Sequence, residues 1–501
     1  MNTTSNRILD NIAWFPEKGY EFKRKDSFSE LIETVQEKLR HSASYSSESL
    51  ASGDVQEEIT SCNKALDHLF KPIKRIPRTF IQSQKLRCVN ALALILSSPI
   101  LLCLLTIALI NTFKIHIKDA LANNRAHDNE NNTQPDELIT NNEIYYAEKW
   151  GYKSVKHHVV TKDGYILCMY RLSKKGTNPK GKRPIMIGHG LFQCSGAFLV
   201  NEEHSMAFQL VEEGYDVWMG NNRAVGGLHH VSLSYLDPEY WNWGLKELGM
   251  NDFTAMVDYI IEETGFSKVG YIGHSQGNAQ VFIALSHCPE FAKKLSIFVA
   301  LAPAIFSGSL VNSFPLKYLV GMSDRVFGLM FGIGPFLSIM TWSQRLVQPH
   351  LFCFLAYSIY SYLFDWWDHH WVRRRKAKYF QFTPRPVSTR LISDWIEGWG
   401  RQGICLDLAK PENYNVKYKV PLVIVYGNAD YLVDGDKFVR TFPGHHNSNS
   451  DNEYYNMFPM LNLIHVERIE GYEHMDTVWA YNNRKTTLPI LFKTLKSGCW
   501  N

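Results

Sequence analysis

The chain has 501 residues, of which 45% are hydrophobic and 20% are charged. This length and composition are typical of a globular protein with one large domain and additional segments. The 53 basic and 49 acidic residues nearly cancel, so the charge gives no support to a nucleic-acid partner, and we expect none.

Three segments precede the predicted folded domain. Residues 1–87 are mostly polar, and their low hydrophobicity predicts a largely disordered N-terminal segment. Residues 88–113 contain no charged side chain, and a stretch of about 20 apolar residues is long enough to cross a hydrocarbon core. This stretch begins too late for a cleaved signal peptide. We therefore predict a membrane anchor at 88–113, followed by a polar linker at 114–143.

The sequence leaves the orientation of this anchor open. Six basic residues precede it and three follow it, which favours a cytosolic N-terminus and a C-terminal domain on the far side. A glycosylation sequon at Asn131 agrees with that orientation. Pro99, however, removes a helix hydrogen bond in mid-segment, and a bent, monotopic insertion would leave both ends cytosolic. The anchor is thus single-pass or monotopic, in the endoplasmic reticulum, a lipid droplet or the plasma membrane.

Residues 144–501 alternate short apolar runs with longer stretches of helical spacing. An Asp163-Gly164 turn separates the first two predicted strands, and the spacing at 256–261 predicts a crossover helix. Strands and helices in alternation predict an α/β fold with a mainly parallel sheet. The remaining predicted strands are 184–187, 269–272, 297–301, 422–426 and 463–469.

One motif in this region has a defined chemical mechanism. Gly273-His274-Ser275-Gln276-Gly277 follows the strand at 269–272 and opens an apolar helical run at 278–286. A G-x-S-x-G pentapeptide between strand and helix places the serine in a sharp turn, where its hydroxyl is exposed at the edge of the sheet. The motif and its context predict an α/β-hydrolase fold with Ser275 as the nucleophile.

A nucleophilic serine needs a base, and the base needs a carboxylate that holds its tautomer. In this fold the chain order is serine, acid, histidine. Asp430 follows the strand at 422–426, and His474 follows the last strand. Asp434 and Asp476 are alternative candidates for the acid. Asp434 lies a further turn beyond the end of the strand, and Asp476 lies beyond His474 in the chain. We therefore predict the triad Ser275, Asp430 and His474.

The mechanism also needs backbone donors for the oxyanion. Gly188-His189-Gly190-Leu191 follows the strand at 184–187, so the N–H groups of Leu191 and Gln276 are the predicted donors. This chemistry requires no cofactor and no metal, and we expect none. The nine cysteines are odd in number and form no C-x-x-C pair, which indicates neither a zinc site nor a full disulfide framework.

Longer matching stretches around these residues extend over most of the domain. With them, residues 144 to 495 resemble the acid lipase family, which includes gastric and lysosomal lipases and fungal steryl ester hydrolases. The resemblance implies the same triad and oxyanion donors, and the N-terminal anchor looks like that of the membrane-bound fungal enzymes. The loop at 224–227 departs from the family pattern. The matching stretches are 161–167, 190–191, 214–223, 271–277 and 472–476.

An insertion at about 304–400 separates the strands at 297–301 and 422–426. In a hydrolase of this fold, such an insertion forms a cap over the serine. Its apolar and aromatic run at 351–367 is too short to span a membrane readily, so it is expected either to form the cap core or to dock on lipid. The basic run at 373–376 either binds anionic headgroups or forms a solvated face.

These features predict a membrane-anchored serine ester hydrolase that acts on steryl esters or other neutral lipid esters at a membrane or lipid-droplet surface. A triacylglycerol lipase would use the same machinery with a different pocket for the alcohol. Acyl transfer to an alcohol and a catalytically inactive membrane scaffold are further alternatives, and the complete triad order argues against the scaffold.

Overall fold

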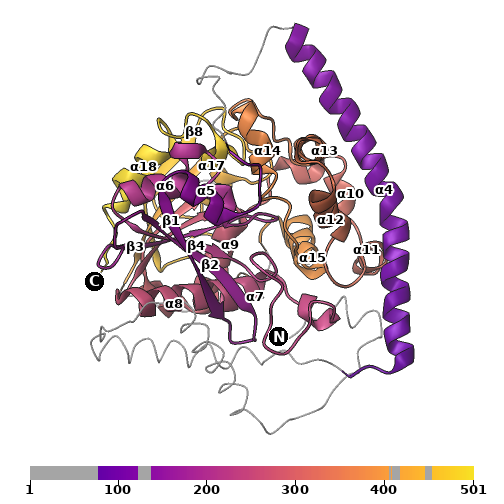
Figure 1. The fold of residues 1–501 in the computed structure, drawn as a ribbon, viewed down its shortest axis with the longest axis horizontal. Coiled ribbons are helices and arrows are strands. Elements are labelled where there is room, and N and C mark those ends of the chain that lie inside the picture. The colour runs from indigo at the N-terminus through magenta and orange to yellow at the C-terminus, as the bar shows by residue number, and fades with distance from the viewer. Residues whose placement is uncertain (1–76, 122–136, 406–407, 409–417, 446–453, 501) are drawn as a thin grey trace.

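The computed structural model describes residues 77–121, 137–405, 408, 418–445 and 454–500 (Figure 1). Its centre is an eight-stranded sheet of order β1-β2-β4-β3-β5-β6-β7-β8, in which β1/β2 and β2/β4 pair antiparallel and the other neighbours pair parallel. The strands are β1 (Tyr152–Val160), β2 (Ile166–Lys174), β3 (Pro184–Gly188), β4 (Asp216–Asn221), β5 (Val269–His274), β6 (Leu295–Leu301), β7 (Val420–Gly427) and β8 (Leu461–Ile469). This confirms the predicted mainly parallel sheet.

The predicted turn at Asp163-Gly164 joins β1 to β2. The N–H of Thr161 donates to the carbonyl of Tyr165 at 2.8 Å, which closes the turn. Gly164 has a φ of +101°, and a Cβ at this position would lie 2.8 Å from the His230 ring. Only glycine combines this backbone conformation with so close an approach.

Helices cover both faces of the sheet, as expected for parallel strands such as β3, β5 and β6 that are buried at every position. Successive residues of a strand point to opposite faces. Tyr271 of β5 therefore packs in one core with Val257 of α8, and Ile272 packs in the other with Leu491 of α18. The helices of the hydrolase domain are α5 (Glu143–Lys149), α6 (Met206–Glu212), α7 (Leu245–Glu247), α8 (Thr254–Thr264), α9 (Gln276–His287), α16 (Gly435–Val439), α17 (Asp476–Trp479) and α18 (Thr487–Leu495).

The insertion between β6 and β7 forms a helical cap at one side of the sheet (Figure 1). In α13, Phe352 and Tyr357 are buried while Leu351 and Phe354 are exposed. The apolar run therefore has one face in the cap core, as one of the two expectations held, and another face that is exposed. The cap helices are α10 (Leu316–Val320), α11 (Asp324–Phe331), α12 (Ser338–Leu346), α13 (Pro349–Phe364), α14 (Lys376–Tyr379) and α15 (Thr389–Glu397).

The predicted anchor lies within a long helix, α4 (Phe80–Leu121), which runs beside the cap (Figure 1). Residues 80–87 and 114–121 were expected in the polar segment and in the linker, but they are also helical. Helix propagation adds a hydrogen bond for each residue that it fixes, so a helix extends past its apolar part wherever the flanking residues tolerate it.

Pro99 lies inside α4 without interrupting it, so the bend expected at this proline does not divide the helix in two. The hydroxyl of Ser98 donates to the carbonyl of Leu94 at 2.6 Å, one turn earlier. The rest of the N-terminal segment and the sequon at Asn131 lie outside the described residues. The eight cysteines among the described residues are all free.

Candidate active site

Ser275 stands in the turn between β5 and α9 with φ +54° and ψ −119°. The flanking glycines make this turn sterically accessible. A Cβ on Gly273 would lie 2.3 Å from the side-chain oxygen of Asn278, and a Cβ on Gly277 would lie 2.7 Å from the carbonyl oxygen of Gly188. The spacing of the motif thus follows from two close approaches, one on each side of the serine.

His474 lies in the loop that connects β8 to α17 and reaches the serine from the far end of the chain. Its Nε2 is 2.8 Å from Oγ of Ser275. Its Nδ1 is 2.7 Å from Oδ2 of Asp430, which follows the end of β7. These distances are within the range for proton transfer between a nucleophile, a base and an orienting carboxylate. The structure brings the three predicted residues together.

The carboxylate of Asp430 is held in place by its own loop. Its Oδ1 accepts hydrogen bonds from the N–H groups of Leu432 at 3.0 Å and Val433 at 3.2 Å. The two competing carboxylates have other partners. Asp434 accepts from the N–H of Lys437 and caps α16.

Asp476, the other competitor, accepts from the rings of His370 and Trp371 at 3.0 and 2.9 Å, respectively. It also accepts from the backbone N–H of Glu473 at 2.8 Å. Asp476 therefore braces the loop that carries His474 instead of contacting the imidazole.

The loop predicted to supply the oxyanion donors lies against the nucleophile. A Cβ on Gly190 would lie 3.1 Å from Cβ of Ser275, so only glycine allows the loop to approach this closely. The N–H of Gly190 donates to Oε1 of Gln193 at 3.0 Å. Leu191 follows directly in the chain, and Gln276 opens α9 beside the serine. Both predicted donors therefore belong to segments that adjoin Ser275.

Two site residues were not predicted from the sequence. His274 donates through Nε2 to the carbonyl oxygen of His474 at 3.1 Å, and burial lowers the pKa of His274 to about 3, which keeps its imidazole neutral. This hydrogen bond ties the elbow to the loop of the base. His274 directly precedes the nucleophile within the G-x-S-x-G motif, and this position in the sequence could have identified it as a site residue.

The second is Trp366, which comes from the cap. Its ring stacks on the ring of His474, with centroids 5.3 Å apart and an angle of 8° between the planes. Trp366 also stacks on Phe364 at 4.7 Å. The N–H of Trp367 donates to the carboxyl group of Glu473. A residue of the cap therefore covers one face of the catalytic imidazole ring.

Three of the four residues in the basic run at 373–376 are ion-paired inside the protein, and Arg373 is exposed. Arg374 and Arg375 pair with the buried carboxylate of Glu202, and Lys376 pairs with Asp368 at 2.7 Å. These three side chains are internal ion-pair partners, so they form neither a headgroup site nor a solvated face. The sequence of so short a run of like charges does not show which of its side chains are buried and which are exposed.

The loop at 224–227, which departs from the family pattern, follows Arg223. The buried guanidinium of Arg223 joins two other segments. It pairs with Asp163 of the β1–β2 turn at 2.8 Å and with Asp252 at 2.6 Å. His230, just beyond the loop, donates through Nε2 to the carbonyl of Asp163 at 2.9 Å. The residues around the loop thus secure the β1–β2 turn.

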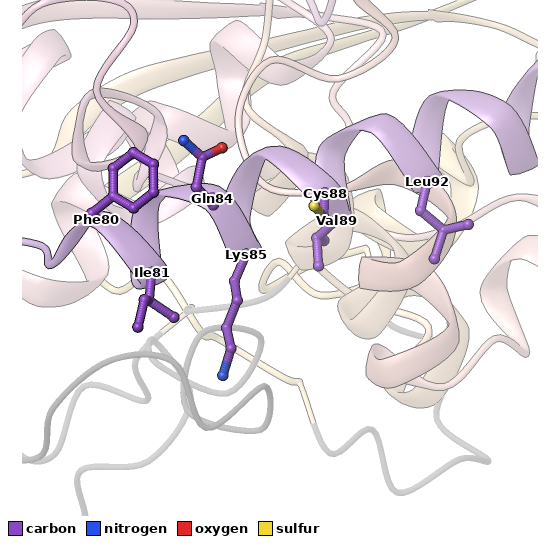
Figure 2. A pocket seen from close by; sticks show the side chains of 7 residues that line it. All are labelled: Phe80, Ile81, Gln84, Lys85, Cys88, Val89 and Leu92. Atoms are coloured by element: carbon purple, nitrogen blue, oxygen red, sulfur yellow. The ribbon is translucent and has the colours of Figure 1, made fainter.

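A hollow of about 380 Å³ lies far from the triad in sequence, beside the first turns of α4. Figure 2 shows that its lining side chains come from one helical stretch, with Ile81 and Lys85 pointing to the same side. A surface lined by a single helix does not enclose a ligand. It is therefore not a substrate site.

Comparison with known proteins places the chain among its relatives. Residues 144–202 match the partial alpha/beta-hydrolase lipase region, and residues 183–328 match the alpha/beta hydrolase fold. Lipase member K of Homo sapiens is 30% identical over 370 residues, which cover 69% of this chain and 88% of that protein. The chain belongs to the acid lipase family of α/β-hydrolases.

The chain is also 28% identical to sterol esterase 2 of Saccharomyces cerevisiae over 386 residues, which cover 68% of each chain. It is 30% identical to gastric triacylglycerol lipase of Mus musculus over 362 residues, which cover 66% of this chain and 85% of that protein. The protein is therefore a carboxylic-ester hydrolase of the lipase and esterase type, and its substrates are lipid esters.

Proposed function

We propose that this acid lipase hydrolyses steryl esters through a covalent acyl-enzyme, with Ser275 as nucleophile, His474 as base and Asp430 as the orienting carboxylate. The observation that carries the proposal is the continuous hydrogen-bond chain from Ser275 Oγ through the imidazole to Asp430, at 2.8 and 2.7 Å. A neutral imidazole in this arrangement has Nδ1–H held by the carboxylate, so Nε2 is free to accept the serine proton.

The reaction proceeds in two halves. His474 takes the proton of Ser275 while Oγ attacks the ester carbonyl, and the N–H groups of Leu191 and Gln276 stabilise the oxyanion. His474 then returns the proton to the sterol oxygen, which leaves as the alcohol. In the second half a water molecule, deprotonated by His474, attacks the acyl-enzyme, and the fatty acid departs as Ser275 regains its proton.

The two relatives favour different alcohol portions of the ester substrate. The similarity to a sterol esterase, together with the resemblance of the N-terminal anchor to that of fungal steryl ester hydrolases, favours a sterol. The similarity to a gastric triacylglycerol lipase favours a glyceride as the second candidate. Hydrolysis rates on steryl oleate and triolein, measured side by side with the purified full chain, distinguish the two substrates.

Replacing the nucleophile tests the enzymatic assignment. S275A is expected to lower kcat on both esters by at least about 10⁴-fold, because a triad without its nucleophile retains only the contribution of binding and the oxyanion donors. S497A removes an exposed hydroxyl near the C-terminus and serves as the control. Unchanged turnover by folded S275A protein would refute the role of Ser275.

We further propose that α4 attaches the enzyme to a membrane or a lipid-droplet surface. Among the described residues, α4 is the helix that is long and apolar enough to cross a membrane, and little of its apolar part is buried. An enzyme with an insoluble substrate gains from attachment to the surface where that substrate is dissolved. Flotation of the full chain with phospholipid vesicles on a density gradient tests this attachment.

A further inference from the structure

The surface of α4 divides into two faces. The buried positions recur at helical spacing and carry small side chains, whereas the rest of the helix is exposed and apolar. Small residues on one face let a helix approach its partner closely. The buried residues are Ala93, Ser97, Ala108 and Thr112, and the exposed ones include Leu94, Ile95, Leu102, Ile110 and Phe113.

The small face of α4 packs on the cap helices α11 and α13. At one end of the contact, Oδ1 of Asn90 accepts from the N–H of Ile333 at 3.0 Å. Gly332 has a φ of +72°, and a Cβ on it would lie 3.2 Å from Cβ of Ala93. The glycine that ends α11 thus permits the close approach of the two helices.

The hydrolase domain holds the beginning of α4 as well. Arg78, just before the helix, pairs at 2.7 Å with Glu239, a buried residue between β4 and α8. Contacts with the same folded body therefore extend from Arg78 to Thr112. In Figure 1, α4 runs beside the cap helices, and its end towards Leu121 extends beyond them.

The length of this contact decides between the two orientations of the anchor. From Ala93 to Thr112 the helix rises about 28 Å, at about 1.5 Å per residue, and the hydrocarbon core of a bilayer is about 30 Å thick. If α4 crossed the bilayer, the cap that lies along it would be inside the hydrocarbon. The cap exposes Arg325 and Arg345 and consists of short helices joined by irregular backbone, which lipid does not accommodate.

We infer that α4 lies in the plane of a single phospholipid leaflet, with its exposed apolar face in the lipid, the cap above it and both of its ends on the same side. This inference rests on the membrane attachment proposed above and not on the identity of the ester. The excess of basic residues before the anchor indicates a side only for a helix that spans the bilayer, so it does not apply here.

A chain with different epitope tags at its N-terminus and C-terminus tests the orientation. Sealed microsomal vesicles from expressing cells are floated and then treated with proteinase K, with and without detergent. The in-plane helix predicts that both tags respond alike. One tag digested and the other protected until detergent is added would overturn the inference. Failure to float would instead contradict the membrane attachment itself, whatever the activity of Ser275.

The packing of α4 on the cap is tested separately with the detergent-solubilised full chain. A108F places a large side chain in the buried contact, whereas C103F makes a similar change on the exposed face. A108F is expected to lower the Tm and the turnover of a water-soluble ester, and C103F is expected to change neither. Equal Tm values for the two variants would show that α4 does not pack on the cap and would remove the basis of the inference.

Discussion

Single residues at this site are held in conformations that the surrounding chain must support. Ser275 has a positive φ, a strained conformation that costs on the order of 1–3 kcal/mol outside glycine. Its N–H donates to the carbonyl of Leu301 at 3.0 Å, on the neighbouring strand β6. The strain therefore persists because the sheet fixes the backbone on which the nucleophile stands.

Glu473, the neighbour of the catalytic histidine, has an unusual protonation state. Burial, together with the negative charge of Asp476, raises the pKa of Glu473 to about 10. The folded protein therefore binds this proton more tightly than the unfolded chain does. The stability that depends on it is fully present below the unfolded pKa of 4.5 and is lost as the pH rises towards 10.

E473Q imitates the protonated acid at every pH, so it is expected to unfold at a higher temperature than the wild type at pH 8 and at nearly the same temperature at pH 4.5. A difference of 1 kcal/mol shifts Tm by about 2–4 °C in a protein of moderate size. Thermal unfolding measured across this pH range provides the check, with E470Q, a change of an exposed carboxylate, as the control. A difference in Tm that does not grow with pH would show that Glu473 is already ionised.

Among the elements, the cap contributes more than a cover. Residues 365–371 follow α13 and contact the loop of the catalytic histidine through Trp366, Trp367 and His370. Because α13 also packs on α4, one helix connects the apolar anchor with the wall of the histidine. A displacement of the cap would therefore change the surface that contacts His474.

W366A is expected to lower kcat about tenfold on a small water-soluble ester with little change in KM, because the imidazole loses the ring that fixes its plane. W366F keeps an aromatic wall and is expected to retain most of the activity. Steady-state kinetics on p-nitrophenyl acetate measure both parameters. If W366A retained full kcat, Trp366 would be cap packing without a positioning role.

At the scale of the whole molecule, one buried ion cluster joins three parts of the chain. Glu202 of the hydrolase domain pairs with Arg374, Arg375 and Lys378 of the cap, and Lys378 also pairs with Glu137 at the end of the linker. Burial by itself would raise the pKa of Glu202, but the hydrogen bonds from the two arginines outweigh it and lower the pKa to about 2.

E202Q leaves the buried cationic side chains without their shared anion, and breaking such a pair costs about 3–5 kcal/mol. We expect this loss in the free energy of unfolding near pH 7. The difference from the wild type should shrink as the pH falls from 4.5 towards 2, where Glu202 becomes protonated. Urea denaturation followed by tryptophan fluorescence measures it. The adjacent E203Q changes an exposed carboxylate and should have little effect.

The sequence by itself determined seven of the eight strands, the elbow and the positions of Ser275, Asp430 and His474, because each depends on a local pattern of apolar runs, glycines and strand ends. The strand β4 (Asp216–Asn221) was not predicted. The tertiary structure alone decided that Trp366 stacks on His474, that Glu202 meets Arg375, and which face of α4 packs on the cap. These contacts join residues more than 100 positions apart. Local pattern specifies an element and its apolar face, but the partner of that face depends on how the whole chain packs.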